Sequence, residues 1–203
     1  MNNILIIGTK NKAKIDQIKS ALKSLSVNVQ GLPDIEFSEV VEDGKTALEN
    51  SCKKAAYYSS AIGQPVLSTD NALYFDSLSD DKQPGLNVRR IEGRVDRPTD
   101  KELLVYYSDF IKKLGNNMNG YWEFGICLAK PSGELLKKIV KSPRIFVSEP
   151  SKKVIPGYPL DSIQINPKTG KYISEMSQAE TDAFWQETIG TELCDFIKTS
   201  DIY

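Results

Sequence analysis

The sequence contains no histidine, and only three of its 203 residues are cysteines. The missing histidine excludes Ser-His-Asp triads, Cys-His pairs, histidine zinc sites and histidine general bases. Cys52, Cys127 and Cys194 are widely spaced and form no C-x-x-C pattern, which indicates reduced thiols. Any catalysis must therefore use carboxylates, lysines, hydroxyls and a hard metal ion such as Mg²⁺.

An excess of positive charge is also missing. The chain has 26 Lys and Arg against 27 Asp and Glu, a formal net charge of −1, so no general basic field favours nucleic acid or an anionic membrane. No apolar run reaches the roughly 18 residues of a membrane span, and the first residues do not resemble a secretory signal. We therefore expect a cytoplasmic protein in which any attraction for phosphate is local.

The length favours one domain, or one compact two-lobed unit, over residues 1–203. With 40% hydrophobic and 26% charged residues, the chain has the composition of a globular protein that buries a sizeable core. Segments with strand and helix patterns interleave along the chain, which predicts an α/β fold.

Apolar runs and helical periodicities locate the expected elements. Strands are expected at 3–8, 27–29, 121–129, 134–141 and 144–148, and 65–75 is expected to form a strand, a polar turn and a second strand. Helices are expected at 12–25, at 46–62, from 99 to near 115, and from 177 toward the C-terminus. The last three begin with capping boxes: Thr46 with Glu49, Thr99 with Glu102, and Ser177 with Glu180. Residues 32–44 show no period and are expected to be a loop.

The segment IIGTKNKAKIDQIKSAL changes at Gly8 from an apolar run to a polar turn, after which a helical pattern begins. Lys10, Lys12 and Lys14 lie at this change, where the free amides and partial positive charge of a helix start suit an anion. The turn lacks the Walker A pattern. On these residues alone it is either a polyphosphate site or a solvated basic turn.

Six segments, in the same order, resemble motifs of the inosine triphosphate pyrophosphatase family, the housecleaning enzymes for non-canonical purine triphosphates. TKNKAK resembles T-G-N-x-x-K, EDGKTALENSCKKA resembles E-T-G-x-T-F-x-E-N-A-x-x-K-A, and VLSTDNALYFDSL resembles V-x-A-D-D-S-G-L-x-V-x-A-L. PGLNVRR resembles P-G-x-Y-S-A-R, GYPLDSI resembles G-F-G-Y-D-P-I, and YISEMSQAE resembles T-F-A-E-M-x-x-E-E. The resemblance implies an elongated mixed β-sheet with flanking helices, two lobes around a central nucleotide cleft, and a homodimer.

The reaction implied by the resemblance is hydrolysis of a nucleoside triphosphate to monophosphate and pyrophosphate, with Mg²⁺ as cofactor. The resemblance assigns phosphate binding to Thr9, Lys10, Asn11, Lys14, Lys54 and Asn71. It makes Asp70 the catalytic base and a Mg²⁺ ligand, Lys14 a second catalytic residue, and Glu42 a further Mg²⁺ ligand. Without the resemblance, Asp70 and its neighbour would read as an ordinary turn and Lys54 as part of a solvated helix face.

Base recognition is where the sequence departs most from the family. The implied base-binding residues are Tyr158, Leu160, Asp161, Thr181, Gln186 and Glu187. Leu160 replaces an aromatic residue, Thr181 replaces a lysine, and Trp185-Gln186-Glu187 replaces S-H-R. Lys10 stands where the family has glycine, Val41 where it has glutamate, and Thr69 where it has the first aspartate of its Asp-Asp pair.

Two functions fit these residues. The first is a Mg²⁺-dependent pyrophosphohydrolase for triphosphates of the ITP, dITP or XTP type, with a rebuilt base pocket. The second is a catalytically weakened subunit that binds dITP or ITP and regulates a partner protein. Both imply a purine nucleoside triphosphate as ligand, and neither implies nucleic acid or a membrane.

Overall fold

The computed structural model describes residues 4–91 and 96–202. The chain divides into two compact units. The first comprises the chain up to Asn71, Glu123–Lys141, and the chain from Asp182 onward; the second comprises Ala72–Trp122 and Ser142–Thr181. None of the described helices is long and apolar enough to cross a membrane.

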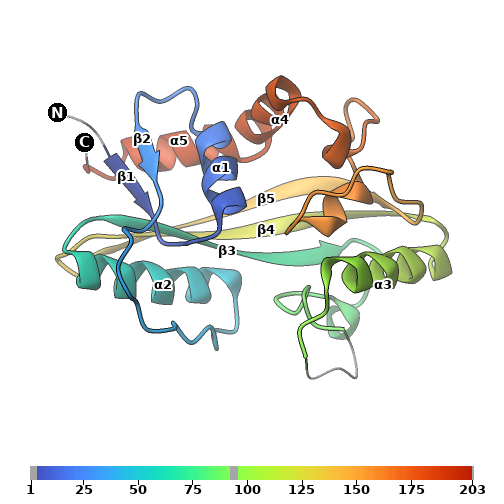
Figure 1. Cartoon of the computed structure of the whole chain (residues 1–203), viewed down its shortest axis with the longest axis horizontal. Coiled ribbons are helices and arrows are strands. Elements are labelled where there is room, and N and C mark those ends of the chain that lie inside the picture. Colours follow the sequence, from blue (N-terminus) through green and yellow to red (C-terminus); the bar gives the residue numbers. More distant parts are fainter. Residues whose placement is uncertain (1–3, 92–95, 203) are drawn as a thin grey trace. The chain divides into compact units, whose positions relative to one another are not determined.

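Six strands form one sheet in the order β2-β1-β3-β4-β5-β6 (Figure 1). Their bounds are β1 Ile4–Ile7, β2 Asn28–Gln30, β3 Val66–Phe75, β4 Asn117–Ala129, β5 Leu135–Val147 and β6 Gln164–Ile165. Strand β1 pairs in parallel with β2 and β3, whereas β5 and β6 are antiparallel. The sheet is therefore mixed, and with its helices it confirms the expected α/β fold.

Five α-helices accompany the sheet in the described chain: α1 Lys12–Ala21, α2 Ala47–Ile62, α3 Asp100–Lys113, α4 Gln178–Trp185 and α5 Thr191–Lys198. A π-helical turn, Gln186–Gly190, joins α4 to α5. All three expected hydroxyl caps are present, because Thr46, Thr99 and Ser177 accept bonds from the amides of Glu49, Glu102 and Glu180. The capping box at Thr46 differs in one respect, since Glu49 accepts the amide of Lys45 instead.

Close helix contacts define the first unit. A Cβ at Gly125 of β4 would lie 2.2 Å from the amide nitrogen of Leu48, so only glycine lets α2 approach this strand. A Cβ at Gly190 would lie 2.5 Å from the carbonyl oxygen of Ala21, at the end of α1. Figure 1 shows β1 leading directly into α1, with β2 beside β1.

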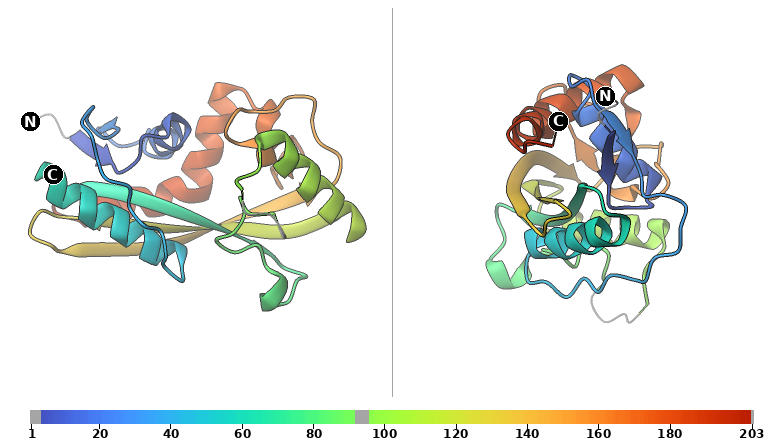
Figure 2. Two further views of the ribbon diagram at one scale, coloured as in Figure 1. Left: turned by 60° about the horizontal axis from the view of Figure 1, so that its bottom comes forward. Right: turned by 90° about the vertical axis from the view of Figure 1, so that its left-hand side faces the viewer.

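The second unit has its own apolar core. Leu103, Tyr107 and Ile111 lie one helical turn apart on α3 and pack into a buried cluster with strand residues. Two of these strand residues, Phe75 and Phe146, meet edge to face with ring centroids 4.9 Å apart. Figure 2 shows α3 beside the strands that it covers.

The structure corrects the expected turn in 65–75, which is one continuous strand of ten residues, β3. Asp70 and Asn71 therefore lie within a strand. The physical reason is that β3 continues beside β4 after its short pairing with β1 at Val66 and Leu67, and pairing with a neighbouring strand outweighs the weak strand preference of Asp and Asn.

Three other boundaries differ from the expectation. Helix α1 ends at Ala21 instead of 25, because Leu25 donates its amide to the carbonyl of Leu22 in a tight turn. The segments expected at 134–141 and 144–148 form one strand, β5, which continues through Pro143. Proline is tolerated there because β6 pairs with β5 only at Ile145 and Phe146, which leaves the edge of β5 at Pro143 unpaired by β6. The C-terminal helix is interrupted by the π-helical turn.

Candidate functional site

The turn between β1 and α1 is fixed by backbone contacts at Gly8. Its amide donates to the carbonyl of Leu67 at 2.8 Å. A Cβ at this position would lie 2.1 Å from Oγ of Ser68, so no larger residue fits without displacing side chains of β3. The glycine thus holds the start of the turn directly against β3.

Asn11 and Thr9 shape the rest of this turn. Asn11 is the N-cap of α1, and its Oδ1 accepts the amide of Ala13 at 3.0 Å. Its own amide donates to Oγ1 of Thr9 at 3.1 Å. Both residues therefore organise the helix start by accepting backbone amides there, and Lys14 lies half-buried in the first turn of α1.

Lys10 is held by the loop that follows β2. Its ammonium donates to the carbonyl of Ile35 at 3.4 Å and lies 5.6 Å from the ring centroid of Phe37, a cation–π contact. Phe37 in turn packs edge to face on Tyr58 of α2, with centroids 5.2 Å apart. The lysine that replaces the family's glycine is therefore braced by aromatic residues.

Three of the residues assigned to chemistry meet in the first unit. Lys54 Nζ lies 3.3 Å from Oδ1 of Asp70 and 3.1 Å from Oε2 of Glu42. The side chains of Lys54 and Asp70 are only 11% and 14% exposed, and that of Glu42 is 46% exposed. We call these three residues, together with Asn50, the Lys54 cluster.

Asn50 joins this cluster although the sequence alone assigned it no role. Its Nδ2 donates to Oδ2 of Asp70 at 3.1 Å, and its Oδ1 accepts the amide of Gly44 at 2.8 Å. Asn50 and Lys54 are four residues apart and so lie on one face of α2, where both are buried. The segment ENSCKKA held a signal for Asn50, namely an amide four residues before the lysine.

The carboxylates of the Lys54 cluster fit a metal ion that is shared with a substrate. Mg²⁺ in proteins commonly binds one or two carboxylates and completes its shell with substrate phosphates and water. Within residues 4–91 and 96–202, no group of three or more His, Cys, Asp or Glu side chains could form an all-protein metal site. Asp70 and Glu42, which contact the same ammonium group, match a site in which the protein supplies only two carboxylates.

The residues beside Asp70 are largely enclosed. Thr69, which replaces the family's first aspartate, is 8% exposed. Asn71 Oδ1 is buried, and among the described residues no group donates a hydrogen bond to it. This oxygen is an acceptor, so any donation to phosphate would have to come from the Nδ2 group of Asn71.

Four of the assigned base-binding residues, Tyr158, Leu160, Asp161 and Thr181, lie in the second unit. Tyr158 is half-buried, and its backbone bridges to Ile155. Leu160 is 5% exposed and belongs to the apolar core, so little of its surface is open to a ligand. Thr181 lies in α4, where its amide donates to the carbonyl of Ser177.

Asp161 belongs to a polar network inside the second unit. Its Oδ1 accepts Nε2 of Gln164 at 3.3 Å, and Oε1 of Gln164 accepts the indole N–H of Trp122 at 2.8 Å. Burial raises the pKa of Asp161 to about 7, and the guanidinium of Arg144 opposes this rise. Burial lowers the pKa of Arg144 to about 9, against the opposing charge of Asp161.

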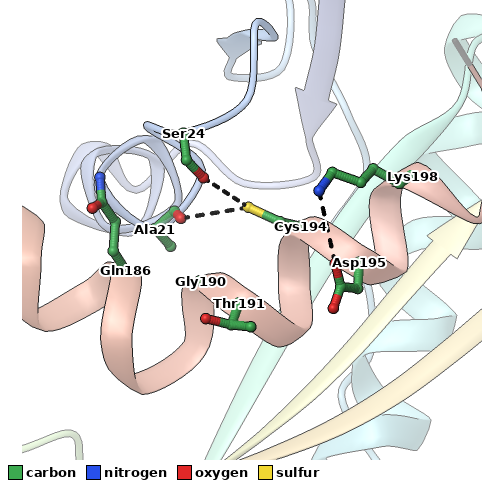
Figure 3. Close-up of a pocket in the computed structure, with 8 residues that line it drawn as sticks. All are labelled: Ala21, Ser24, Gln186, Gly190, Thr191, Cys194, Asp195 and Lys198. Carbon is green, nitrogen blue, oxygen red and sulfur yellow. Dashed lines mark hydrogen bonds and ion pairs between the residues drawn. The ribbon is translucent and has the colours of Figure 1, made fainter.

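Gln186 and Glu187 lie in the π-helical turn of the first unit. Glu187 is exposed, whereas Gln186 lines a cavity of about 280 Å³. The other lining residues come from the end of α1, the π-helical turn and α5: Ala21, Ser24, Gly190, Thr191, Cys194, Asp195 and Lys198 (Figure 3). This cavity contains no residue of the Lys54 cluster, so it brings Gln186 together with none of the residues assigned to phosphate.

Comparison with known proteins agrees with the motifs. The sequence profile of the Ham1 family matches residues 5–186. The chain is 33% identical to the dITP/XTP pyrophosphatase of Geobacter sulfurreducens over 150 residues, 69% of this chain and 73% of that protein. It is 28% identical to a dITP/XTP pyrophosphatase of Thermus thermophilus over 177 residues, 87% of this chain and 82% of that protein.

Solved structures share the fold. The Ham1 protein of Coxiella burnetii superposes with a TM-score of 0.70 at 20% identity, covering 97% of this chain and 99% of that one. The Ham1 protein of Staphylococcus aureus superposes with a TM-score of 0.68 at 20% identity, covering 98% and 100%. The profile match, the relatives and the fold confirm the resemblance to inosine triphosphate pyrophosphatases, and the chain belongs to the Ham1 family.

Proposed function

We propose that the protein hydrolyses non-canonical purine nucleoside triphosphates, of the dITP, ITP or XTP type, to monophosphate and pyrophosphate. The observation that carries the proposal is the Lys54 cluster, in which one buried ammonium joins the carboxylates of Asp70 and Glu42. The names of the relatives in Geobacter and Thermus support the same reaction. The chain supplies these groups without histidine.

Residues of the first unit have separate roles in phosphate binding, proton transfer and metal binding. Lys10 and Lys14, beside the positive end of the α1 dipole, bind the phosphate chain electrostatically. The Asp70 carboxylate orients a water molecule and accepts its proton as the water oxygen bonds to the α phosphorus; the bond from that phosphorus to the bridging oxygen breaks, and pyrophosphate leaves with the bridging oxygen. Asp70 and Glu42 would hold Mg²⁺, which when bound neutralises charge on the phosphate oxygens.

Base recognition is assigned to a separate set of residues in this proposal. Asp161 and Tyr158 present a carboxyl and a phenol, which can exchange hydrogen bonds with the keto and N–H groups of a 6-oxopurine. The network through Gln164 and Trp122 fixes the carboxyl of Asp161. A fixed polar group discriminates strongly, because the wrong base leaves it without its hydrogen bond.

The proposal is tested by turnover over a nucleotide panel. ITP, dITP, XTP, ATP and GTP are incubated with the protein and Mg²⁺, and pyrophosphate is converted to phosphate and measured with malachite green. We expect turnover of the 6-oxo substrates that favours ITP, dITP and XTP, that EDTA abolishes, and that Asp70→Asn reduces by two or more orders of magnitude. Lys53→Met is the matched control, since Lys53 pairs with Asp43 outside the cluster.

The nucleotide-sensing alternative predicts a different result. It is favoured by Gln186 and Glu187, which place a neutral and an acidic side chain where the family has S-H-R. Calorimetry would then show ITP or dITP binding without turnover, and a partner protein would co-purify.

We further propose a homodimer for the active enzyme, which light scattering during size-exclusion chromatography tests.

A further inference from the structure

Lys54 is a buried cation whose visible partners are the two carboxylates assigned to the metal. Its side chain is 11% exposed and lies between Oδ1 of Asp70 and Oε2 of Glu42, at 3.3 and 3.1 Å. A buried ammonium is stable only with such pairing, and two neighbouring carboxylates likewise need a cation. The three side chains therefore neutralise one another locally, leaving one net negative charge.

A divalent cation and this ammonium would compete for the same oxygens. The Asp70 carboxylate has little freedom, because its side chain is only 14% exposed and Asn50 Nδ2 holds its Oδ2 at 3.1 Å. Lysine, by contrast, has a flexible four-carbon stem and a compact charge that can change partners. Exchange at this site thus requires Lys54 to move, while Asp70 stays in place.

We propose that Lys54 is the resident counter-cation of the Asp70–Glu42 pair in the nucleotide-free protein, and that it yields this place to a divalent cation arriving with the triphosphate. The phosphates then provide the new partner for the ammonium. The identity of the nucleotide rests on the proposed function; the cation exchange itself rests on the contacts of Lys54. It follows that a divalent cation alone binds weakly to the nucleotide-free protein. The cation and the triphosphate each raise the protein's affinity for the other.

The test is Mn²⁺ binding to the nucleotide-free protein, followed by electron paramagnetic resonance of free Mn²⁺. We expect Lys54→Met to bind Mn²⁺ about tenfold to a hundredfold more tightly than wild type, the range of one charge-assisted hydrogen bond. Lys53→Met, on the same helix, should leave the affinity unchanged, because Lys53 pairs with the exposed Asp43. Equal or weaker Mn²⁺ binding by Lys54→Met overturns the proposal.

A second variant guards against misfolding. Lys54→Gln keeps a polar chain of similar length without the charge, and it should show the same gain if Lys54→Met does not fold. Adding Glu42→Gln to either variant should remove the gain, since it removes one carboxylate of the pair; a gain that survives this change contradicts the assigned site. The Mn²⁺ measurement does not depend on turnover. A protein without turnover would refute the proposed function, whereas the exchange of Lys54 for a divalent cation would still be decided by the Mn²⁺ affinities.

Discussion

At the scale of single residues, Asn50 uses both ends of its amide side chain. It is 4% exposed and connects the Asp70 carboxylate to the backbone amide of Gly44, two residues after Glu42. One amide side chain thereby positions the proposed general base and the segment that carries the second carboxylate. Asn50 is a positioning residue, because its contacts are to Asp70 and Gly44.

Two substitutions separate these contacts. Asn50→Ala removes both, whereas Asn50→Asp keeps the acceptor for the Gly44 amide and sets a carboxylate against Asp70. We expect both variants to lower kcat about tenfold to a hundredfold, since each removes the hydrogen bond that orients Asp70, and Asn50→Ala to change KM much less. Steady-state kinetics on the best substrate of the panel measures both constants. Wild-type kcat in Asn50→Asp would show that anchoring Gly44 is the only role of Asn50.

At the scale of elements, sequence patterns located structure wherever the deciding interactions are local. The caps at Thr46, Thr99 and Ser177 depend on residues three apart, and all three helices begin there. The turn expected at Asp70 was wrong, because pairing of β3 with β4 involves residues far apart in the sequence. Asn50 was missed for the same reason, since its partner Asp70 is 20 residues away.

The contact between α1 and the π-helical turn gives an element-scale prediction. Replacing Gly190 by alanine inside a helix normally stabilises it by about 1 kcal/mol. Here the added Cβ would lie 2.5 Å from the carbonyl oxygen of Ala21, a backbone atom, so we expect Gly190→Ala to lower the free energy of unfolding by about 1–3 kcal/mol. Urea denaturation measures this change. A more stable variant would show that α1 and the π-helical turn can move apart without loss of stability.

At the scale of the whole molecule, charge is nearly balanced but unevenly placed. The formal net charge is −1, yet the first unit pairs Lys54 with Glu42 and Asp70, and the second unit buries Arg144 with Asp161. Composition could exclude a general basic surface, but it could not reveal these local sites. They arise from residues that the fold brings together within each unit.

The buried carboxyl of Asp161 predicts how stability varies with pH. Burial raises its pKa from 3.8 to about 7, so between these values the folded protein holds a proton that the unfolded chain has lost. This group therefore makes the free energy of unfolding fall as pH rises from about 4 to 7. Asp161→Asn should flatten this slope in urea titrations at several pH values. Arg144 stays charged throughout this range, so it shifts the curve without changing its slope; an unchanged slope contradicts the assignment.

The loop at 31–45 has neither helix nor strand, yet side chains outside it hold it at separate points along its length. Lys10 binds the carbonyl of Ile35, Tyr57 accepts the amide of Ser38, and Lys54 pairs with Glu42. Val41, next to Glu42, is 69% exposed. An environment-sensitive fluorophore attached at position 41 would sit one residue from a carboxylate that loses its ammonium partner when nucleotide arrives. The loop thus offers a place to convert ligand arrival into an optical signal.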